Sequence, residues 1–169
     1  MSDNNHQSKV LDFMKLCEQY ESENSSIDIL RLSERDTRVI KLRLNLLLEK
    51  VQELFHAVLL NRTDSKYFES FFKILLNNIS KLSNEDIDIN LEELAKCLVD
   101  IEYINLGTAS LLNIDSENLF DIVHQDNLSK IDPVTKKVVK RVDGKILKHE
   151  SYQPLNLKTS RELWLRDYK

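Results

Sequence analysis

The sequence is poor in the two residues that most often interrupt helices. Its 169 residues include two glycines and two prolines, whereas 31% of the residues are charged and 41% are hydrophobic. Glycine and proline are the least favourable residues in a helix interior, and both are common in turns. The chain therefore has few turn-formers and many helix-formers, and its length suits one domain with its own core. We predict a predominantly helical protein.

Three further absences limit the class of protein. The two cysteines, Cys17 and Cys97, are far apart and give no disulfide framework, which favours a reduced, intracellular protein. No apolar run is long enough to cross a bilayer, and the first residues are polar, unlike a secretory signal. The net charge of −4 argues against nonspecific binding to duplex nucleic acid. We expect a soluble, cytoplasmic protein that binds neither membranes nor duplex nucleic acid.

The spacing of apolar residues predicts the helices. Hydrophobic side chains recur at helical intervals in three long segments, at residues 39–60, 67–79 and 90–113. Shorter helices are expected at residues 10–16, after a cap at Asp115, and at residues 159–168, where Leu163 and Trp164 would anchor the tail. Ser33 and the acids that follow it predict the start of the first long helix. Polar clusters predict breaks at residues 21–26, 61–64 and 84–86.

The pattern changes after Pro133. Two short segments rich in valine, isoleucine and lysine, residues 138–142 and 145–148, flank Asp143-Gly144. An Asp-Gly pair between such segments is a common signal for a tight turn, so we predict a short hairpin here.

Three acidic residues form the first candidate site. Glu49 and Glu53 lie four residues apart and share one face of a helix, and Asp100 lies on a later helix that could pack opposite them. Carboxylates that converge from two helices can hold magnesium or manganese, which would bridge phosphate oxygens and help to activate a water. The alternative is that all three are solvated acids on helix surfaces, and spacing alone favours this alternative.

A second candidate site follows near the C-terminus. Asn127 and Lys130 lie three residues apart on one helical edge, and Arg141 and Lys145 flank the Asp-Gly turn. An amide can donate and accept hydrogen bonds with a base or sugar, and a lysine supplies a point charge for phosphate. The alternative is a helix C-terminus that favours cations, followed by a solvated basic hairpin.

Together, these segments resemble the all-α nucleoside triphosphate pyrophosphohydrolases, the superfamily of MazG-like and phosphoribosyl-ATP pyrophosphohydrolase-like proteins. The resemblance covers residues 39–154, and Tyr103 and the Gly107-Thr108-Ala109 segment also fit it. It implies a MazG-like bundle of four to five main helices with a short C-terminal hairpin, assembled as a homodimer or homotetramer. It also implies that Glu49, Glu53 and Asp100 are catalytic ligands of magnesium or manganese. The nucleotide-binding residues that it implies are Asn127, Lys130, Arg141 and Lys145.

Two positions depart from the family pattern. The motif Glu-Glu-x-x-Glu reads Glu49-Lys50-Val51-Gln52-Glu53 here, and Glu-x-x-Asp reads Cys97-Leu98-Val99-Asp100. Lys50 could pair with Glu53 or Asp100 in the place of a divalent ion. A thiol is a poor ligand for magnesium, so we expect Cys97 to be a small, buried apolar residue. A single-ion site on the three remaining carboxylates stays open.

These departures lead to two hypotheses about function. The first is a protein that binds a nucleoside triphosphate or related nucleotide, with hydrolysis weak or lost and no metal needed. The alternative is an active magnesium- or manganese-dependent pyrophosphohydrolase that releases a nucleoside monophosphate and pyrophosphate. We divide the chain into an N-terminal helix with a polar lead (residues 1–32), the MazG-like domain (33–154) and a tail helix (155–169).

Overall fold

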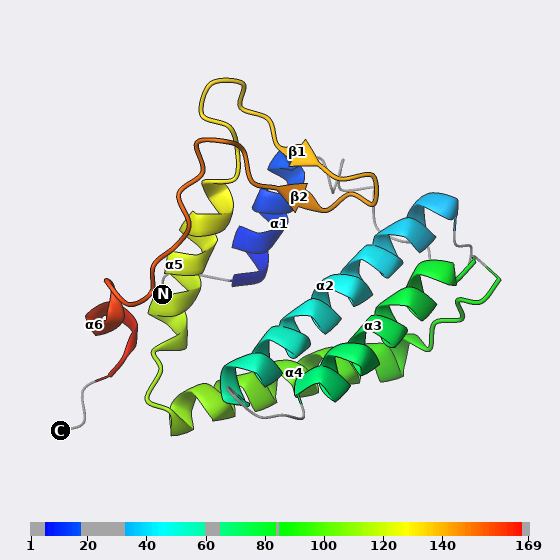
Figure 1. Cartoon of the computed structure of the whole chain (residues 1–169), viewed down its shortest axis with the longest axis horizontal. Coiled ribbons are helices and arrows are strands. Elements are labelled where there is room, and N and C mark those ends of the chain that lie inside the picture. Colours follow the sequence, from blue (N-terminus) through cyan, green and yellow to red (C-terminus); the bar gives the residue numbers. More distant parts are fainter. Residues whose placement is uncertain (1–5, 18–32, 60–64, 84, 167–169) are drawn as a thin grey trace. The chain divides into compact units, whose positions relative to one another are not determined.

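The computed structural model describes residues 6–17, 33–59, 65–83 and 85–166 (Figure 1). The described residues are mostly helical and contain one two-stranded sheet, which confirms the predicted all-α class. The chain divides into two compact units, one formed by residues 27–89 and the other by residues 1–26 together with 90–169. The elements in chain order are α1 (His6–Leu16), α2 (Glu34–Val58), α3 (Ser65–Lys81), α4 (Leu91–Leu111), α5 (Ser116–Leu128), β1 (Val139–Lys140), β2 (Ile146–Leu147) and α6 (Arg161–Trp164).

The long helix α2 begins where the sequence predicts. The Asp36 amide donates to the Ser33 hydroxyl at 3.2 Å, and the Ser33 amide donates to the Asp36 carboxylate at 2.9 Å. This reciprocal capping box satisfies amides that have no partner within the first turn of a helix.

In the first unit, α2 and α3 lie side by side and run antiparallel (Figure 1). Phe55, late in α2, stacks on Phe68, early in α3, with ring centroids 5.3 Å apart. At the other end of the pair, the Lys41 ammonium donates to the carbonyl of Leu82 at 2.7 Å. Phe72 is buried beside Phe55, so this unit is held by aromatic packing at one end and by a polar tie at the other.

In the second unit, α1 and α6 both pack on α5. The Lys9 ammonium is 2.6 Å from the Asp121 carboxylate, and the His6 ring stacks on Phe120 at 3.8 Å. Asp115 caps α5 by accepting from the Asn118 amide at 3.2 Å, as the sequence predicts.

The C-terminal segment, residues 149–166, returns along α5 in the antiparallel direction. His149 Nε2 lies 2.9 Å from the Ser129 carbonyl near the end of α5. Near its start, the Asp115 amide donates to the Trp164 carbonyl at 2.6 Å, and Ile114 pairs with Leu165 in an antiparallel bridge. The segment is therefore fixed at both ends of α5.

The predicted hairpin is confirmed. Val139 pairs with Leu147 and Lys140 with Ile146. Gly144 has a φ of 88°, in the left-handed region that glycine adopts without steric cost.

The tail differs from the prediction. The helix α6 covers Arg161–Trp164, so it begins later and ends earlier than the predicted residues 159–168, of which 167 and 168 lie outside the described residues. Trp164 anchors it as predicted, because its indole N–H donates to the Leu157 carbonyl at 3.1 Å. The prediction for Leu163 is wrong, since that side chain is 57% exposed.

The remaining sequence predictions concern breaks and membrane spans. The breaks predicted at residues 21–26 and 61–64 lie outside the described residues, as does Asn84 in the third. No helix in the described part of the chain is both long enough and apolar enough to span a bilayer.

Replacing Ser33→Ala tests the capping box. The change removes the acceptor for the Asp36 amide, and we expect the free energy of unfolding of the α2–α3 unit to fall by about 1 kcal/mol, measured by urea denaturation. Ser80→Ala is a matched control, because the exposed Ser80 hydroxyl donates only to a carbonyl of its own helix, Asn77. The control should change stability by less than about 0.5 kcal/mol. Equal effects of the two changes would contradict the assigned role of the cap.

Candidate functional site

The carboxylates predicted on α2 share one face of the helix, and a lysine neutralises one of them. The Lys50 ammonium lies 2.7 Å from Glu53 Oε2, one turn along α2. This confirms the predicted pairing of Lys50 with Glu53. Both side chains are more than 60% exposed, so the pair adds little stability, but it places a positive charge among the predicted metal ligands.

On α4, Asp100 has a lysine partner that the sequence analysis missed. The Lys96 ammonium is 2.5 Å from Asp100 Oδ2, across one helical turn. The four-residue spacing was a readable signal, because oppositely charged residues at this interval are neighbours on a helix. Cys97 is exposed on α4, so the prediction of a buried thiol is wrong. Its neighbours on α4 are themselves exposed.

The predicted metal ligands belong to different compact units. Glu49 and Glu53 lie in the α2–α3 unit, and Asp100 lies in the unit that contains α4 and α5. Among the residues that the structure describes, no group of three or more histidine, cysteine, aspartate or glutamate side chains could hold a metal ion. Glu49 and Glu53 therefore lie together on α2, whereas Asp100, on α4, is paired with Lys96.

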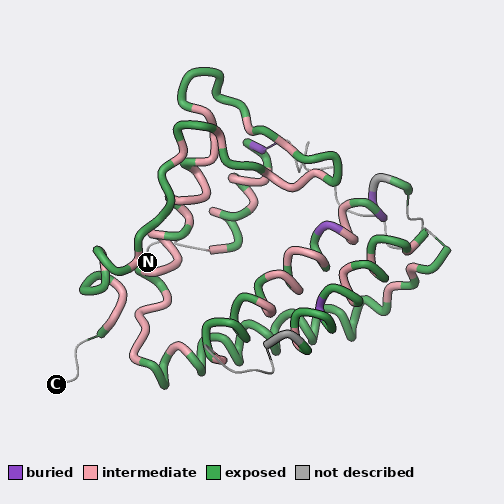
Figure 2. The backbone as a smooth tube through the Cα atoms, viewed as in Figure 1, coloured by how far each residue is buried: buried purple, intermediate pink, exposed green. Residues whose placement is uncertain are grey.

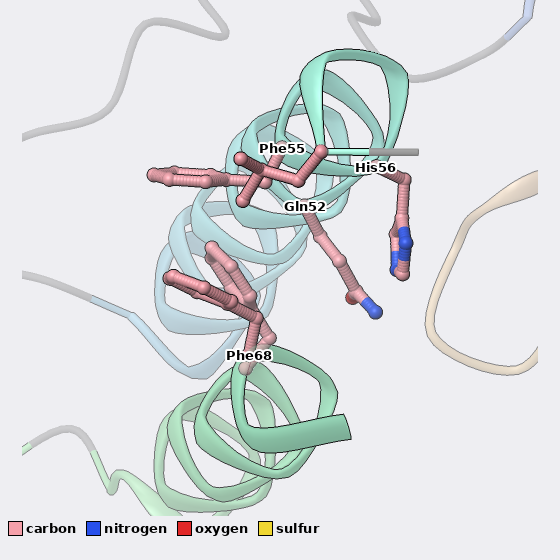
Figure 3. A pocket seen from close by; sticks show the side chains of 6 residues that line it. Gln52, Phe55, His56 and Phe68 are labelled. Atoms are coloured by element: carbon pink, nitrogen blue, oxygen red, sulfur yellow. The ribbon is translucent and has the colours of Figure 1, made fainter. Parts of the chain in front are cut away.

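A small pocket opens beside the α2 carboxylates. Gln52 and His56 lie three residues after Glu49 and Glu53, respectively, and continue the same helical face. Figure 3 shows their side chains leaving α2 next to each other, with Phe68 of α3 below. The pocket is lined by Gln52, Phe55, His56, Leu59, Phe68 and Phe72. It offers an aromatic wall with an amide and an imidazole at its edge.

The predicted nucleotide residues at the end of α5 come together. The Lys130 ammonium donates to Asn127 Oδ1 at 2.5 Å, and the Lys130 side chain is only 22% exposed. The carboxylate of Asp126, 14% exposed, lies 3.9 Å from the same ammonium. The two side chains lie on one helical edge, as predicted, and the structure adds a hydrogen bond between them.

Asp126 is a second residue that the sequence analysis missed. Its Oδ1 accepts the Tyr152 hydroxyl at 2.5 Å and the Leu155 amide at 3.2 Å, both from the C-terminal segment. Burial, followed by the hydrogen bond to Asp126, raises the pKa of Tyr152 to about 12, so the hydroxyl remains a donor at physiological pH. No sequence spacing identifies this contact, because 26 residues separate the two partners.

Within the basic hairpin, Arg141 forms an ion pair with Asp143. Arg141 Nε donates to Asp143 Oδ1 at 2.9 Å and its Nη2 to Asp143 Oδ2 at 2.5 Å. The hydrogen bonds from Arg141 lower the pKa of the Asp143 carboxyl to about 2. Lys145 closes the same loop, since its carbonyl accepts from the Arg141 amide at 2.8 Å. The structure therefore brings Arg141 and Lys145 together, with the guanidinium directed at a carboxylate of the loop.

The comparison with known families agrees with the resemblance in the sequence. The family model described as phosphoribosyl-ATP pyrophosphohydrolase matches residues 12–127, more than half of the chain. The matched range contains Glu49, Glu53, Asp100 and Asn127 and stops before the hairpin. With the mostly helical structure, it confirms the predicted MazG-like, all-α fold. No curated protein and no solved structure matches the chain significantly.

The Arg141–Asp143 pair gives the hairpin a defined acid sensitivity. Because pairing lowers the folded-state pKa of Asp143 from 3.8 to about 2, the pair stabilises the loop above pH 3.8 and loses this contribution as the pH falls towards 2. We expect the Gly144 amide resonance to titrate with a midpoint near 2 in an NMR titration. Asp143→Asn should abolish the transition, and a midpoint near 3.8 in the unmodified protein would contradict the pairing.

Proposed function

Because the chain belongs to the phosphoribosyl-ATP pyrophosphohydrolase family, we propose that it binds a nucleotide while its pyrophosphohydrolase activity is weak or lost. The family supports a nucleotide pyrophosphohydrolase type of function. The observation that carries the proposal of weak hydrolysis is the pairing of Lys50 with Glu53. An ammonium stands where the family motif has a second carboxylate.

The remaining donors suit a divalent ion poorly. Magnesium and manganese prefer several negatively charged oxygen ligands, and Lys50 and Lys96 each neutralise one of the candidate carboxylates. The thiol of Cys97 is a soft ligand that favours other metals. The donors that this chain offers therefore do not fit the divalent ion that hydrolysis in the family would use. Binding would then need no metal cofactor.

The α5 edge supports nucleotide binding. Lys130 supplies a partly buried positive charge, and Asn127 holds it while offering its own amide donor. Arg141 and Lys145 add basic groups on the hairpin, where a polyphosphate would compete with Asp143 for the Arg141 guanidinium. The ligand is a nucleoside triphosphate or a related nucleotide such as phosphoribosyl-ATP.

We also propose that the chain forms a homodimer through α4. This helix carries apolar residues on all sides, and Leu98, Ile104 and Leu111 are 55%, 64% and 84% exposed (Figure 2). A helix that is hydrophobic all round is normally buried, and a second copy would bury it by twofold symmetry. We place this assembly in the cytoplasm, where an exposed thiol such as Cys97 stays reduced.

Restoring the family carboxylates tests the loss of hydrolysis. We expect the purified protein to release almost no pyrophosphate from phosphoribosyl-ATP or from a panel of ribo- and deoxyribonucleoside triphosphates, with magnesium or manganese present. The combined change Lys50→Glu and Cys97→Glu should raise release at least about tenfold in a metal-dependent manner, since a divalent ion can lower the barrier by several kcal/mol.

The matched control for this experiment is Lys73→Glu, which makes the same charge reversal at an exposed position of α3. It should leave pyrophosphate release unchanged. Robust, metal-dependent turnover by the unmodified protein would overturn the proposal and establish the alternative, an active pyrophosphohydrolase.

Changing Ile104→Asp tests the dimer. The aspartate would place a charge in the middle of the proposed interface, so we expect the protein to become monomeric in light scattering coupled to size exclusion. Val142→Asp is the control, because it makes the same substitution type at a fully exposed position of the hairpin. A monomeric unmodified protein would refute the proposed dimer. A measured mass equal to four chains would indicate a homotetramer instead.

A further inference from the structure

Asp126 connects Lys130 to the C-terminal segment. Its Oδ1 accepts two hydrogen bonds from that segment, from the Tyr152 hydroxyl at 2.5 Å and the Leu155 amide at 3.2 Å. Its Oδ2 lies 3.9 Å from the Lys130 ammonium. One small, mostly buried carboxylate thus faces a candidate phosphate-binding cation on one side and residues outside the family match on the other.

The distances show how the ammonium is held. At 3.9 Å, Lys130 is too far from Asp126 for a hydrogen bond, whereas it donates at 2.5 Å to the neutral amide oxygen of Asn127. The two donors on Oδ1 stabilise part of the carboxylate charge. Among the contacts that the structure describes, the ammonium donates its hydrogen bond to the neutral Asn127 amide and is attracted by Asp126 from a greater distance. A phosphate can displace a neutral amide from an ammonium more easily than it can displace a carboxylate.

We propose that Asp126 and Tyr152 are positioning residues for Lys130, and that the hydroxyl of Tyr152 keeps the Asp126 carboxylate from capturing the ammonium that binds the nucleotide phosphate. This inference rests on the proposed function of the Asn127–Lys130 edge and adds a requirement to it. The C-terminal segment completes the binding edge, although the family match ends before that segment begins.

The experiment is a double-mutant cycle with ATP as the probe, measured by isothermal titration calorimetry. Tyr152→Phe removes one donor from Asp126, so its carboxylate should form a direct ion pair with Lys130, and we expect ATP to bind about tenfold more weakly. Adding Asp126→Asn replaces the capturing charge with a neutral amide. The double variant should therefore bind ATP more tightly than Tyr152→Phe alone and return to within about threefold of the unmodified protein.

If the role of Tyr152 is merely structural, adding Asp126→Asn to Tyr152→Phe should change the affinity for ATP in the opposite direction. If Tyr152 only fastens the C-terminal segment, then removing Asp126 as well should weaken binding further or leave it unchanged, and that result would overturn the proposal. So would a Tyr152→Phe variant that binds ATP normally. Tyr67→Phe, the same chemical change at a tyrosine that is 78% exposed on α3, is the matched control and should have no effect.

A second measurement needs no ligand. If the unmodified protein binds neither ATP nor any other nucleotide of the pyrophosphate-release panel, the proposed function fails. The positioning of Lys130 can still be read from its rate of acetylation by an amine-reactive ester, followed by mass spectrometry. A direct ion pair keeps the amine protonated, so Tyr152→Phe should slow acetylation of Lys130 severalfold, and the double variant should reverse this. Asp126→Asn alone, which keeps both donors of the C-terminal segment, should raise the rate even if Tyr152→Phe folds poorly. Equal rates in all four proteins would disprove the positioning.

Discussion

A carboxylate that is largely removed from water needs hydrogen-bond donors, and Asp126 is such a carboxylate. Its donors come from residues that follow α5 by more than 20 positions, so satisfying the carboxylate fixes the course of the C-terminal segment. Few side chains are fully buried in the described residues. The polar contacts along α5, from Ser129 to Asp115, determine where this segment lies.

The acidic candidate residues on α2 and α4 and the basic ones on α5 and the hairpin have different kinds of partner. On α2 and α4, Glu53 and Asp100 are each paired with a lysine of the same helix, Lys50 and Lys96. On α5 and the hairpin, cations are held next to amides and carboxylates, by Asn127 for Lys130 and by Asp143 for Arg141. Charged groups in both sets therefore have partners close by in the sequence, and Lys130 differs from the others because its hydrogen bond goes to a neutral amide.

Much of the fold could be predicted from local sequence. The capping residues Ser33 and Asp115, the hydrophobic spacing of the long helices and the Asp-Gly turn are local signals, and each corresponds to an observed element. The lysine partners on α2 and α4 are local as well, although Lys96 was missed. In contrast, the contact of Asp126 with Tyr152 depends on how a distant segment returns along α5, which no spacing encodes. The exposed state of Cys97 was also unpredictable, because an apolar helix indicates burial without specifying what covers it.

The left-handed backbone at Gly144 has an evolutionary consequence. Most other residues there would strain the loop by about 1–2 kcal/mol, asparagine and aspartate less, so most single substitutions at this position are disfavoured even though the loop is at the surface. The loop length is constrained for the same reason, because an insertion would move the glycine away from the point where the chain reverses. Charged side chains on both arms of the hairpin can therefore be exchanged without changing the backbone spacing between Arg141 and Lys145.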